Sequence, residues 1–224
     1  MSANAEKKPA ANNRAKGRKR MSQAERTAAS DRRMRDAAIE LICSKGAHNT
    51  TLKEIGELAG FSRGLASNRF GSKEELFARL VSEFNYQWRT ELGLSVGGRT
   101  GIPALLAALD AVERFLIDQP AYIKAMYVLW YESIASHSEI RKKLAVYHRR
   151  YREDITRWLQ QGMAQKLVRS DIVPERFAVQ FVSFIFGTIY QWLVSPDAVD
   201  VSQAFKDFRR IMLDRLVERR TPPG

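Results

Sequence analysis

The stretch TTLKEIGELAGFSRGLASNRFGSKEELF, residues 50–77, decides the fold of this 224-residue chain. Thr51 is followed three residues later by Glu54, and Ser72 is followed in the same way by Glu75. Each pair forms a capping box, in which two side chains bond free backbone N–H groups at the start of a helix. The sequence therefore predicts one helix beginning after Thr51 and another beginning after Ser72.

Between these two starts, the segment SRGLASNRF (62–70) predicts a further short helix, joined to the first by a turn at Gly60. Phe61, Ala66 and Phe70 recur at helical spacing and are expected to point inward. Two short helices joined by a tight turn containing glycine are typical of a helix-turn-helix.

The outward face of this short helix is polar and small. Gly64, Ser67 and Asn68 together cost a helix interior about 2 kcal/mol relative to alanine, so we expect them to serve another purpose. Small side chains let a helix approach a DNA duplex closely, and Arg63 and Asn68 are suited to guanine and adenine in the major groove. Arg69 suits a phosphate. The pattern favours a helix that reads DNA.

The stretch from Arg33 to Phe84, and above all residues 50–77, resembles the DNA-binding domain of the tetracycline-repressor (TetR) family of bacterial transcriptional regulators. The resemblance rests on a Thr-Thr helix start, an Ile-Gly-x-x-Ala-Gly run into the turn, Ser-Arg-Gly opening the next helix, and Ser-Lys-Glu-x-Leu beginning the long helix. It implies an all-α regulator whose remaining helices bind a small molecule and form a dimer.

The resemblance also implies roles for individual residues. Thr50 and Thr51 would meet the phosphate backbone, and Lys73 would match the phosphate-binding lysine of the family. The residues expected to contact DNA are Thr50, Thr51, Ser62, Arg63, Gly64, Leu65, Ser67, Asn68, Arg69 and Lys73. Many members carry an aromatic run where this chain has residues 67–69, so the operator sequence cannot be inherited from them.

The net charge of +12 is concentrated at the N-terminus, where residues 1–35 hold eleven Lys or Arg residues and three acidic residues. Such a distribution favours a polyanionic partner, and it favours nucleic acid over an anionic membrane because no amphipathic apolar face accompanies it. Residues 1–28 show no apolar periodicity and are expected to form a disordered basic arm. Whether this arm contacts DNA is left open.

Helical periodicity continues through the rest of the chain, which predicts an all-α fold of about nine helices. The first helix is expected from Ser30 to Gly46, and a glycine-rich break begins at Gly93. Five longer helices are expected near 103–118, 121–135, 138–165, 174–194 and 202–219. The expected domains are the arm (1–28), a helix-turn-helix DNA-binding domain (29–86) and an effector-binding and dimerisation domain (87–220).

Aromatic residues at helical spacing crowd the C-terminal half, and they predict a cavity for a small hydrophobic effector. The candidate ligand contacts are Met126, Tyr127, Trp130, Tyr131, Tyr151, Phe181 and Phe184. The helix near 174–194 is apolar almost all round, and with 202–219 it is expected to form a homodimer suited to a palindromic DNA operator. These helices loosely resemble the ligand domains of the choline-regulator branch of the family.

Several other kinds of protein are disfavoured. No apolar run reaches the roughly 18 residues of a membrane span, so we expect a cytoplasmic protein without a membrane partner. The G-x-S-x-G run at 93–97 follows a helix rather than a strand, which disfavours a nucleophile elbow. The histidines His48, His137 and His148 lack metal-ligand spacing. We therefore predict no catalytic residue, no metal and no cofactor.

The leading hypothesis is a ligand-responsive, dimeric DNA-binding regulator that acts as a repressor. A second hypothesis is a sequence-tolerant protein that coats DNA without responding to a small molecule, for which specific and random DNA would bind equally well. A third is a small all-α enzyme acting on a hydrophobic substrate, although no constellation of acid, base and nucleophile supports it. Turnover assays on stabilising ligands would separate the third from the others.

Overall fold

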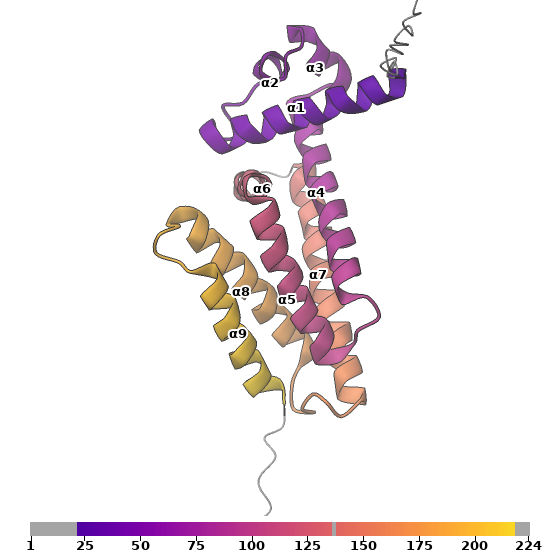
Figure 1. Cartoon of the computed structure of the whole chain (residues 1–224), viewed down its shortest axis with the longest axis vertical. Coiled ribbons are helices and arrows are strands. Elements are labelled where there is room, and N and C mark those ends of the chain that lie inside the picture. The colour runs from indigo at the N-terminus through magenta and orange to yellow at the C-terminus, as the bar shows by residue number, and fades with distance from the viewer. Residues whose placement is uncertain (1–21, 136–137, 218–224) are drawn as a thin grey trace, which may run out of the picture.

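The computed structural model describes residues 22–135 and 138–217, and over these ranges it contains nine α-helices and no β-strand. They are α1 (Gln23–Lys45), α2 (Leu52–Leu58), α3 (Arg63–Phe70), α4 (Lys73–Val96), α5 (Gly101–Asp118), α6 (Pro120–Ile134), α7 (Glu139–Ala164), α8 (Pro174–Val194) and α9 (Val201–Leu216). Figure 1 shows α1–α3 at one end of an elongated molecule, with α4 leading into a bundle of the later helices. The predicted all-α class is confirmed.

The first helix begins earlier than its apolar pattern indicates. Ser22 Oγ accepts a hydrogen bond from the Glu25 backbone N–H at 3.2 Å, and the Ser22 N–H donates to Glu25 Oε2 at 2.7 Å. This capping box starts α1 at Gln23. The expectation of disorder through residue 28 is therefore wrong for residues 23–28, while residues 1–21 lie outside the described residues.

Both predicted capping boxes are present, at the starts of α2 and α4. Ser62 occupies the N-cap position of α3, but its side chain makes no capping hydrogen bond. The short helix α3 therefore depends on its packing against neighbouring helices rather than on a local cap.

The packing of α3 against α2 is close because of Gly56. A Cβ atom added to Gly56 would lie 3.2 Å from the Ser62 carbonyl oxygen and 3.7 Å from Ala66 Cβ. Ala66 is 0% exposed and Phe70 6% exposed, while Phe61 is half-buried and packs against the core. The predicted inward set is confirmed.

The long helix α4 joins the two ends of the molecule (Figure 1). Its 24 residues span about 36 Å at 1.5 Å per residue. The helix runs through Gly93 to Val96, so the expected break shrinks to residues 97–100. A glycine inside a helix costs about 1 kcal/mol, and the buried side chains of Leu92 and Val96 on either side offset it. The expected domain boundary at residue 86 falls inside this uninterrupted helix.

The five C-terminal helices begin and end within three residues of their predicted bounds. Their largest fully buried side chains include Leu105, Leu109, Met126, Leu159 and Phe181. The prolines at the starts of α6 and α8 occupy the first turn, where a missing N–H costs nothing. This core holds the bundle around the cavity described below.

Among the described residues, α8 is the one helix long and apolar enough, by length and composition, to cross a membrane. Only 28% of its most apolar window is buried within the chain. Val179, Tyr190 and Val194 on α8 are 51%, 44% and 67% exposed, and Ile211 on the neighbouring α9 is 60% exposed. The α8–α9 side of the bundle thus presents an apolar surface to its surroundings.

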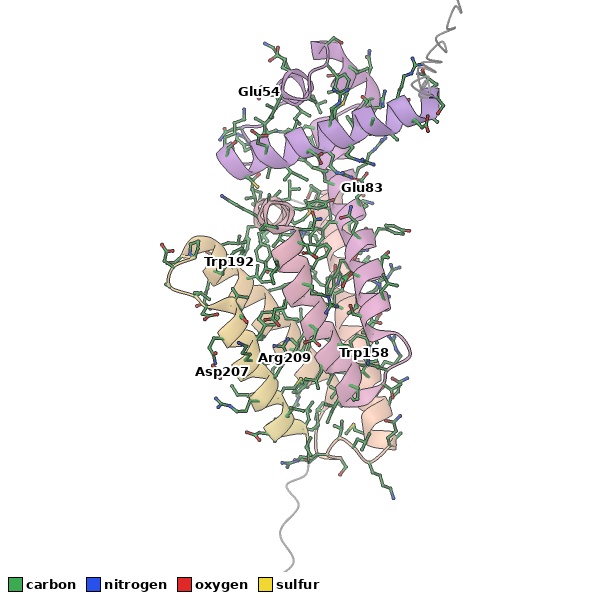
Figure 2. The ribbon with its side chains drawn as sticks, in the orientation of Figure 1. Glu54, Glu83, Trp158, Trp192, Asp207 and Arg209 are labelled. Atoms are coloured by element: carbon green, nitrogen blue, oxygen red, sulfur yellow. The ribbon has the colours of Figure 1, made fainter. Side chains whose placement is uncertain are left out.

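Among the contacts that attach the α1 region to the bundle, two lie at well-separated points. The Ala47 backbone N–H, just after α1, donates to Glu132 Oε1 of α6 at 3.1 Å. Nearer the middle of α1, Arg35 forms an ion pair of 3.9 Å with Glu83 of α4, and Figure 2 places Glu83 at this junction. The N-terminal helices are therefore attached to both α4 and α6.

Candidate functional site

The exposed surface of α3 is formed by small and polar residues. Ser67 and Asn68 are exposed, and Gly64 is exposed with no atom within 4 Å of the position where a Cβ would lie. Leu65 is half-buried and packs against the core instead of lying fully outward. Arg63 is the first residue of α3, and its side chain lies outside the described part of the structure. Because these side chains are small, a partner can approach the backbone of α3 closely at this surface.

Residues expected to contact phosphates mostly have partners within the protein. Arg69 forms an ion pair with Asp31 of α1 and donates to the Thr27 carbonyl oxygen at 3.4 Å. The Lys73 ammonium donates to the carbonyl oxygens of Ala47 and His48 at 3.2 and 2.9 Å. These contacts fix the position of α3 and of the α1–α2 connection, and the sequence pattern carries no signal for them because the partners lie 25 to 42 residues apart.

The two threonines before α2 differ in exposure. Thr50 is 0% exposed, and its hydroxyl donates to the Gly46 carbonyl oxygen at 2.8 Å. Thr51 is exposed and serves as the N-cap residue. Of the residues predicted to contact DNA, the structure gathers Thr51, Ser62, Gly64, Ser67 and Asn68 at the surface, leaves Leu65, Arg69 and Lys73 half-buried, and buries Thr50.

A cavity of about 90 Å³ lies between α4, α5, α6, α7 and α8. This volume is well above the roughly 10 to 15 Å³ that one water molecule needs. Half of its lining residues are aromatic, namely Phe84, Trp88, Phe115, Tyr127, Trp130, Tyr151, Trp158, Phe181 and Phe186. The cavity suits an apolar or aromatic guest.

Four of the seven predicted ligand residues line the cavity, namely Tyr127, Trp130, Tyr151 and Phe181. The other three lie elsewhere. Met126 is fully buried outside the cavity wall. Tyr131 is 49% exposed with its ring 5.0 Å from that of Tyr190, and Phe184 stacks on Phe208 of α9 at 3.8 Å.

Wall residues on α4 and α7 were missed by sequence reasoning. Phe84 and Trp88 are four residues apart on α4, but such apolar spacing alone does not distinguish a cavity wall from a packed core. Asp154 is 7% exposed and lies on the same face of α7 as Tyr151 and Trp158. A charged residue on a buried stripe is unusual, and that signal could have identified Asp154 from the sequence.

The polar groups around the cavity are few. The Tyr127 hydroxyl donates to the Phe186 carbonyl oxygen at 3.1 Å, and the Tyr151 hydroxyl donates to Asn85 Oδ1 at 3.0 Å. Burial raises the pKa of both phenols, so both remain neutral. Within the described residues, the indole N–H of Trp130 is buried without a hydrogen-bond partner. A polar atom of a guest could satisfy it.

Two features bear on catalysis and metal binding. Ser95 lies inside α4, where its hydroxyl donates to Glu91 Oε1 at 3.1 Å, so the G-x-S-x-G run does not form the strand-turn-helix of a nucleophile elbow. Over residues 22–135 and 138–217, no group of three or more His, Cys, Asp or Glu side chains is placed to hold a metal ion.

The chain matches two known family descriptions. Residues 35–80 match the bacterial regulatory proteins of the tetR family. Residues 101–218, more than half of the chain, match the C-terminal part of BetI-type transcriptional repressors.

Individual relatives agree with these matches. The chain is 23% identical to the HTH-type transcriptional regulator AcrR of Shigella flexneri over 189 residues, covering 80% of this chain and 85% of that protein. It is 30% identical to the HTH-type transcriptional regulator BetI of Rhizobium meliloti over 121 residues, covering 54% and 59%.

Among solved structures, a Saccharomonospora viridis protein described as a transcriptional regulator, in complex with choline, has a TM-score of 0.76 at 18% identity. The match covers 86% of this chain and 100% of that one. At this identity the match shows the fold alone, while the two family matches show the membership. The chain therefore belongs to the tetR family of bacterial regulatory proteins and is a DNA-binding transcriptional regulator.

Proposed function

We propose that this regulator is a repressor that binds a palindromic operator as a homodimer and releases it when a small hydrophobic effector occupies the aromatic cavity. Regulators of this family are soluble cytoplasmic proteins that bind DNA and small-molecule effectors and act as dimers. The repressor role is supported by the match of residues 101–218 to BetI-type repressors. We place this chain in the cytoplasm on the same grounds.

The observation that carries the proposal is the course of α4. The first residue of this helix, Lys73, bonds the connection between α1 and α2. Further along the same helix, Phe84, Trp88 and Leu92 line the cavity. One continuous helix thus contacts both the DNA-binding unit, formed by α1–α3, and the cavity. A shift of α4 caused by a guest therefore reaches the DNA-binding unit directly.

In this proposal α3 is the recognition helix, and its N-terminal and outward residues enter the major groove. Arg63 and Asn68 are assigned to base edges, Ser67 to either a base or a phosphate, and Gly64 to close approach of the backbone. Thr51 and Ser62 are assigned to phosphates near the starts of their helices. Their exposure supports these assignments for every residue whose side chain the structure describes.

The predicted DNA contacts that are buried or already bonded within the protein receive a different role. Arg69 and Lys73 already bond protein groups, and Thr50 is buried. We assign them to holding α3 and the α1–α2 connection in place, with phosphate contact secondary. Leu65, which is half-buried, is assigned to packing at the edge of the groove-facing surface.

An effector with many heavy atoms does not fit the cavity as it stands, because the cavity volume is only about 90 Å³. A larger guest has to displace helices that line the cavity. A ligand that prefers the displaced arrangement shifts the population toward it by its difference in affinity for the two states. The DNA-competent arrangement then becomes rarer, and operator affinity falls.

The dimer is assigned to α8 and α9. These helices present Val179, Tyr190, Val194 and Ile211 as exposed apolar side chains, and burying such side chains between two copies of the chain is favourable. The same face on two copies forms an isologous interface, which matches the two-fold symmetry of a palindromic operator.

The test begins with selection of bound DNA fragments, followed by titration of the selected operator and of random DNA at several salt concentrations. We expect the operator to bind at least a thousandfold more tightly than random DNA at physiological salt. Adding a cavity ligand should weaken operator binding and leave random binding nearly unchanged. A ratio near one between operator and random DNA would instead support the DNA-coating alternative.

A further inference from the structure

A second hollow adjoins the aromatic cavity and has a different chemistry. It lies where α4 ends and α5 begins, against the C-terminal half of α7. Leu92, Asp154 and Trp158 line both hollows, and Figure 2 shows Trp158 in this part of the bundle. The polar side chains that line the second hollow are Arg89, Arg99, Thr100, Asp154, Arg157 and Gln161. An apolar chamber therefore meets a polar one at Asp154.

The charges at this junction do not balance. Asp154 has a side chain only 9% exposed, and the guanidinium groups of Arg89 and Arg157 both form ion pairs with it. Arg89 and Arg157 are 42% and 54% exposed, so each keeps N–H groups that can reach a further partner. One carboxylate neutralises one of these two cations and leaves the other in excess.

The remaining groups around the second hollow do not cancel this excess. Arg99 donates to the carbonyl oxygens of Ser95 and Val96 at the end of α4. The C-terminus of α4 and the N-terminus of α5 adjoin the hollow with partial charges of opposite sign. The arginine side chains therefore decide the local electrostatic potential, which is positive.

We infer that the effector is an amphipathic anion, with an apolar part in the aromatic cavity and a carboxylate or phosphate head group against Arg89 and Arg157. A guanidinium offers paired N–H donors that match a carboxylate or phosphate in two-point contacts. Gln161 has a buried amide oxygen without a partner among the described residues, and rotation of this amide presents its N–H groups to the same head group. The inference rests on the proposed function because it names the class of effector.

Aromatic walls by themselves also suit a cation, as in cages that bind quaternary ammonium groups. Choline in the Saccharomonospora viridis complex is a ligand of this kind. In this chain, however, the one carboxylate that the described residues place at the cavity wall is already paired with two guanidinium groups. An ammonium ligand there would add a third positive charge to one negative charge, so the balance favours an anion.

The first experiment measures the affinity of the full chain for four decyl probes by titration calorimetry, below their micelle-forming concentrations. The probes are decanoate, decyl phosphate, decyltrimethylammonium and decanol, which share a chain and differ in head group. We expect the two anions to bind at least tenfold more tightly than the other two, and their order to distinguish a carboxylate site from a phosphate site. Equal or tighter binding of decyltrimethylammonium than of either anion would overturn the inference.

The second experiment uses two substitutions with opposite expected signs. Arg157→Gln should weaken binding of the anionic probe about tenfold and leave decanol unchanged. Asp154→Asn should strengthen it several-fold, because both arginines are released toward the ligand. A cation site would lose affinity on Asp154→Asn. Arg150→Gln, an exposed change on the same helix that lines neither hollow, is the matched control.

Operator binding separates this inference from the proposed function. If decanoate binds through Arg157 but leaves operator affinity unchanged, the head-group site stands and the effector role fails. If all four probes bind alike and each releases the operator, the effector role stands and the anion inference fails. If no probe binds at all, both are overturned.

Discussion

Replacing Gly71 with alanine should destabilise the link between α3 and α4. Gly71 has φ +74° and ψ −84°, and the Ser72 N–H donates to the Phe70 carbonyl oxygen at 3.0 Å across it. This is a γ-turn with a positive central φ, which is rare and strained for any residue with a side chain. Such backbone conformations cost a non-glycine residue about 1 to 3 kcal/mol.

A second cost comes from the capping box of α4. A Cβ on residue 71 would lie 2.1 Å from Glu75 Oε2, and Glu75 must move away from Ser72, which costs about 1 kcal/mol. The stiffer unfolded chain returns about 0.4 to 1 kcal/mol. We therefore expect Gly71→Ala to lower the free energy of unfolding by about 1 to 3.6 kcal/mol.

Urea unfolding at a fixed protein concentration measures this change, with Gly64→Ala as the control. Gly64 has open space around its Cβ position and should gain about 0.5 kcal/mol as alanine in a helix. The double variant Gly71→Ala with Glu75→Ala should cost much less than the two single changes combined, because the first change has already displaced Glu75. An unfolding midpoint for Gly71→Ala equal to that of the wild type would refute the reasoning.

Three further predictions concern DNA reading, pH and assembly. Asn68→Ala should weaken operator binding by about 1 to 3 kcal/mol while random DNA and unfolding stay unchanged, as anisotropy titrations would show; equal losses on both DNAs would contradict base reading. Hydrogen bonds from Lys45 and then Thr51 lower the pKa of Glu54 to about 2. The stability that the Glu54 carboxylate contributes is therefore complete above about pH 5 and is lost as the pH falls toward 2. Glu54→Gln should thus make the urea midpoint less dependent on pH over that range, and an unchanged pH dependence would contradict this linkage. Ile211→Glu should shift the chain toward monomer in sedimentation, because it places a charge on the exposed apolar face of α9. A dimer that stays intact would contradict the assignment of the interface to this face.

Local patterns predicted much of this fold. The capping boxes at Thr51 and Ser72, and the inward spacing of Ala66 and Phe70, depend only on residues a few positions apart, and each is confirmed. The apolar pattern does not indicate the start of α1, because residues 23–28 lack apolar periodicity, although Ser22 and Glu25 form the same kind of box.

The candidate sites were less predictable because their geometry depends on distant partners. The outward face of α3 follows from helical spacing, but the bonds from Lys73 to the α1–α2 connection join residues 25 and 26 positions apart. Likewise, Phe184 is as apolar as Phe181, yet its ring stacks on Phe208 of α9 while Phe181 lines the cavity. Aromatic periodicity identifies buried helix faces and cannot assign them to a cavity or to a neighbouring helix.

The two attachments of α1 to the bundle have a geometric consequence. Arg35, paired with α4, lies ten residues or about 15 Å before the last residue of α1, and Ala47, bonded to α6, follows that end by two residues. If α4 and α6 slide past each other by about 1 Å, a helix held at both points must rotate by about 3°. A small translation inside the bundle is thereby converted into a change of orientation, and in a two-fold symmetric dimer both DNA-binding units would turn by the same angle.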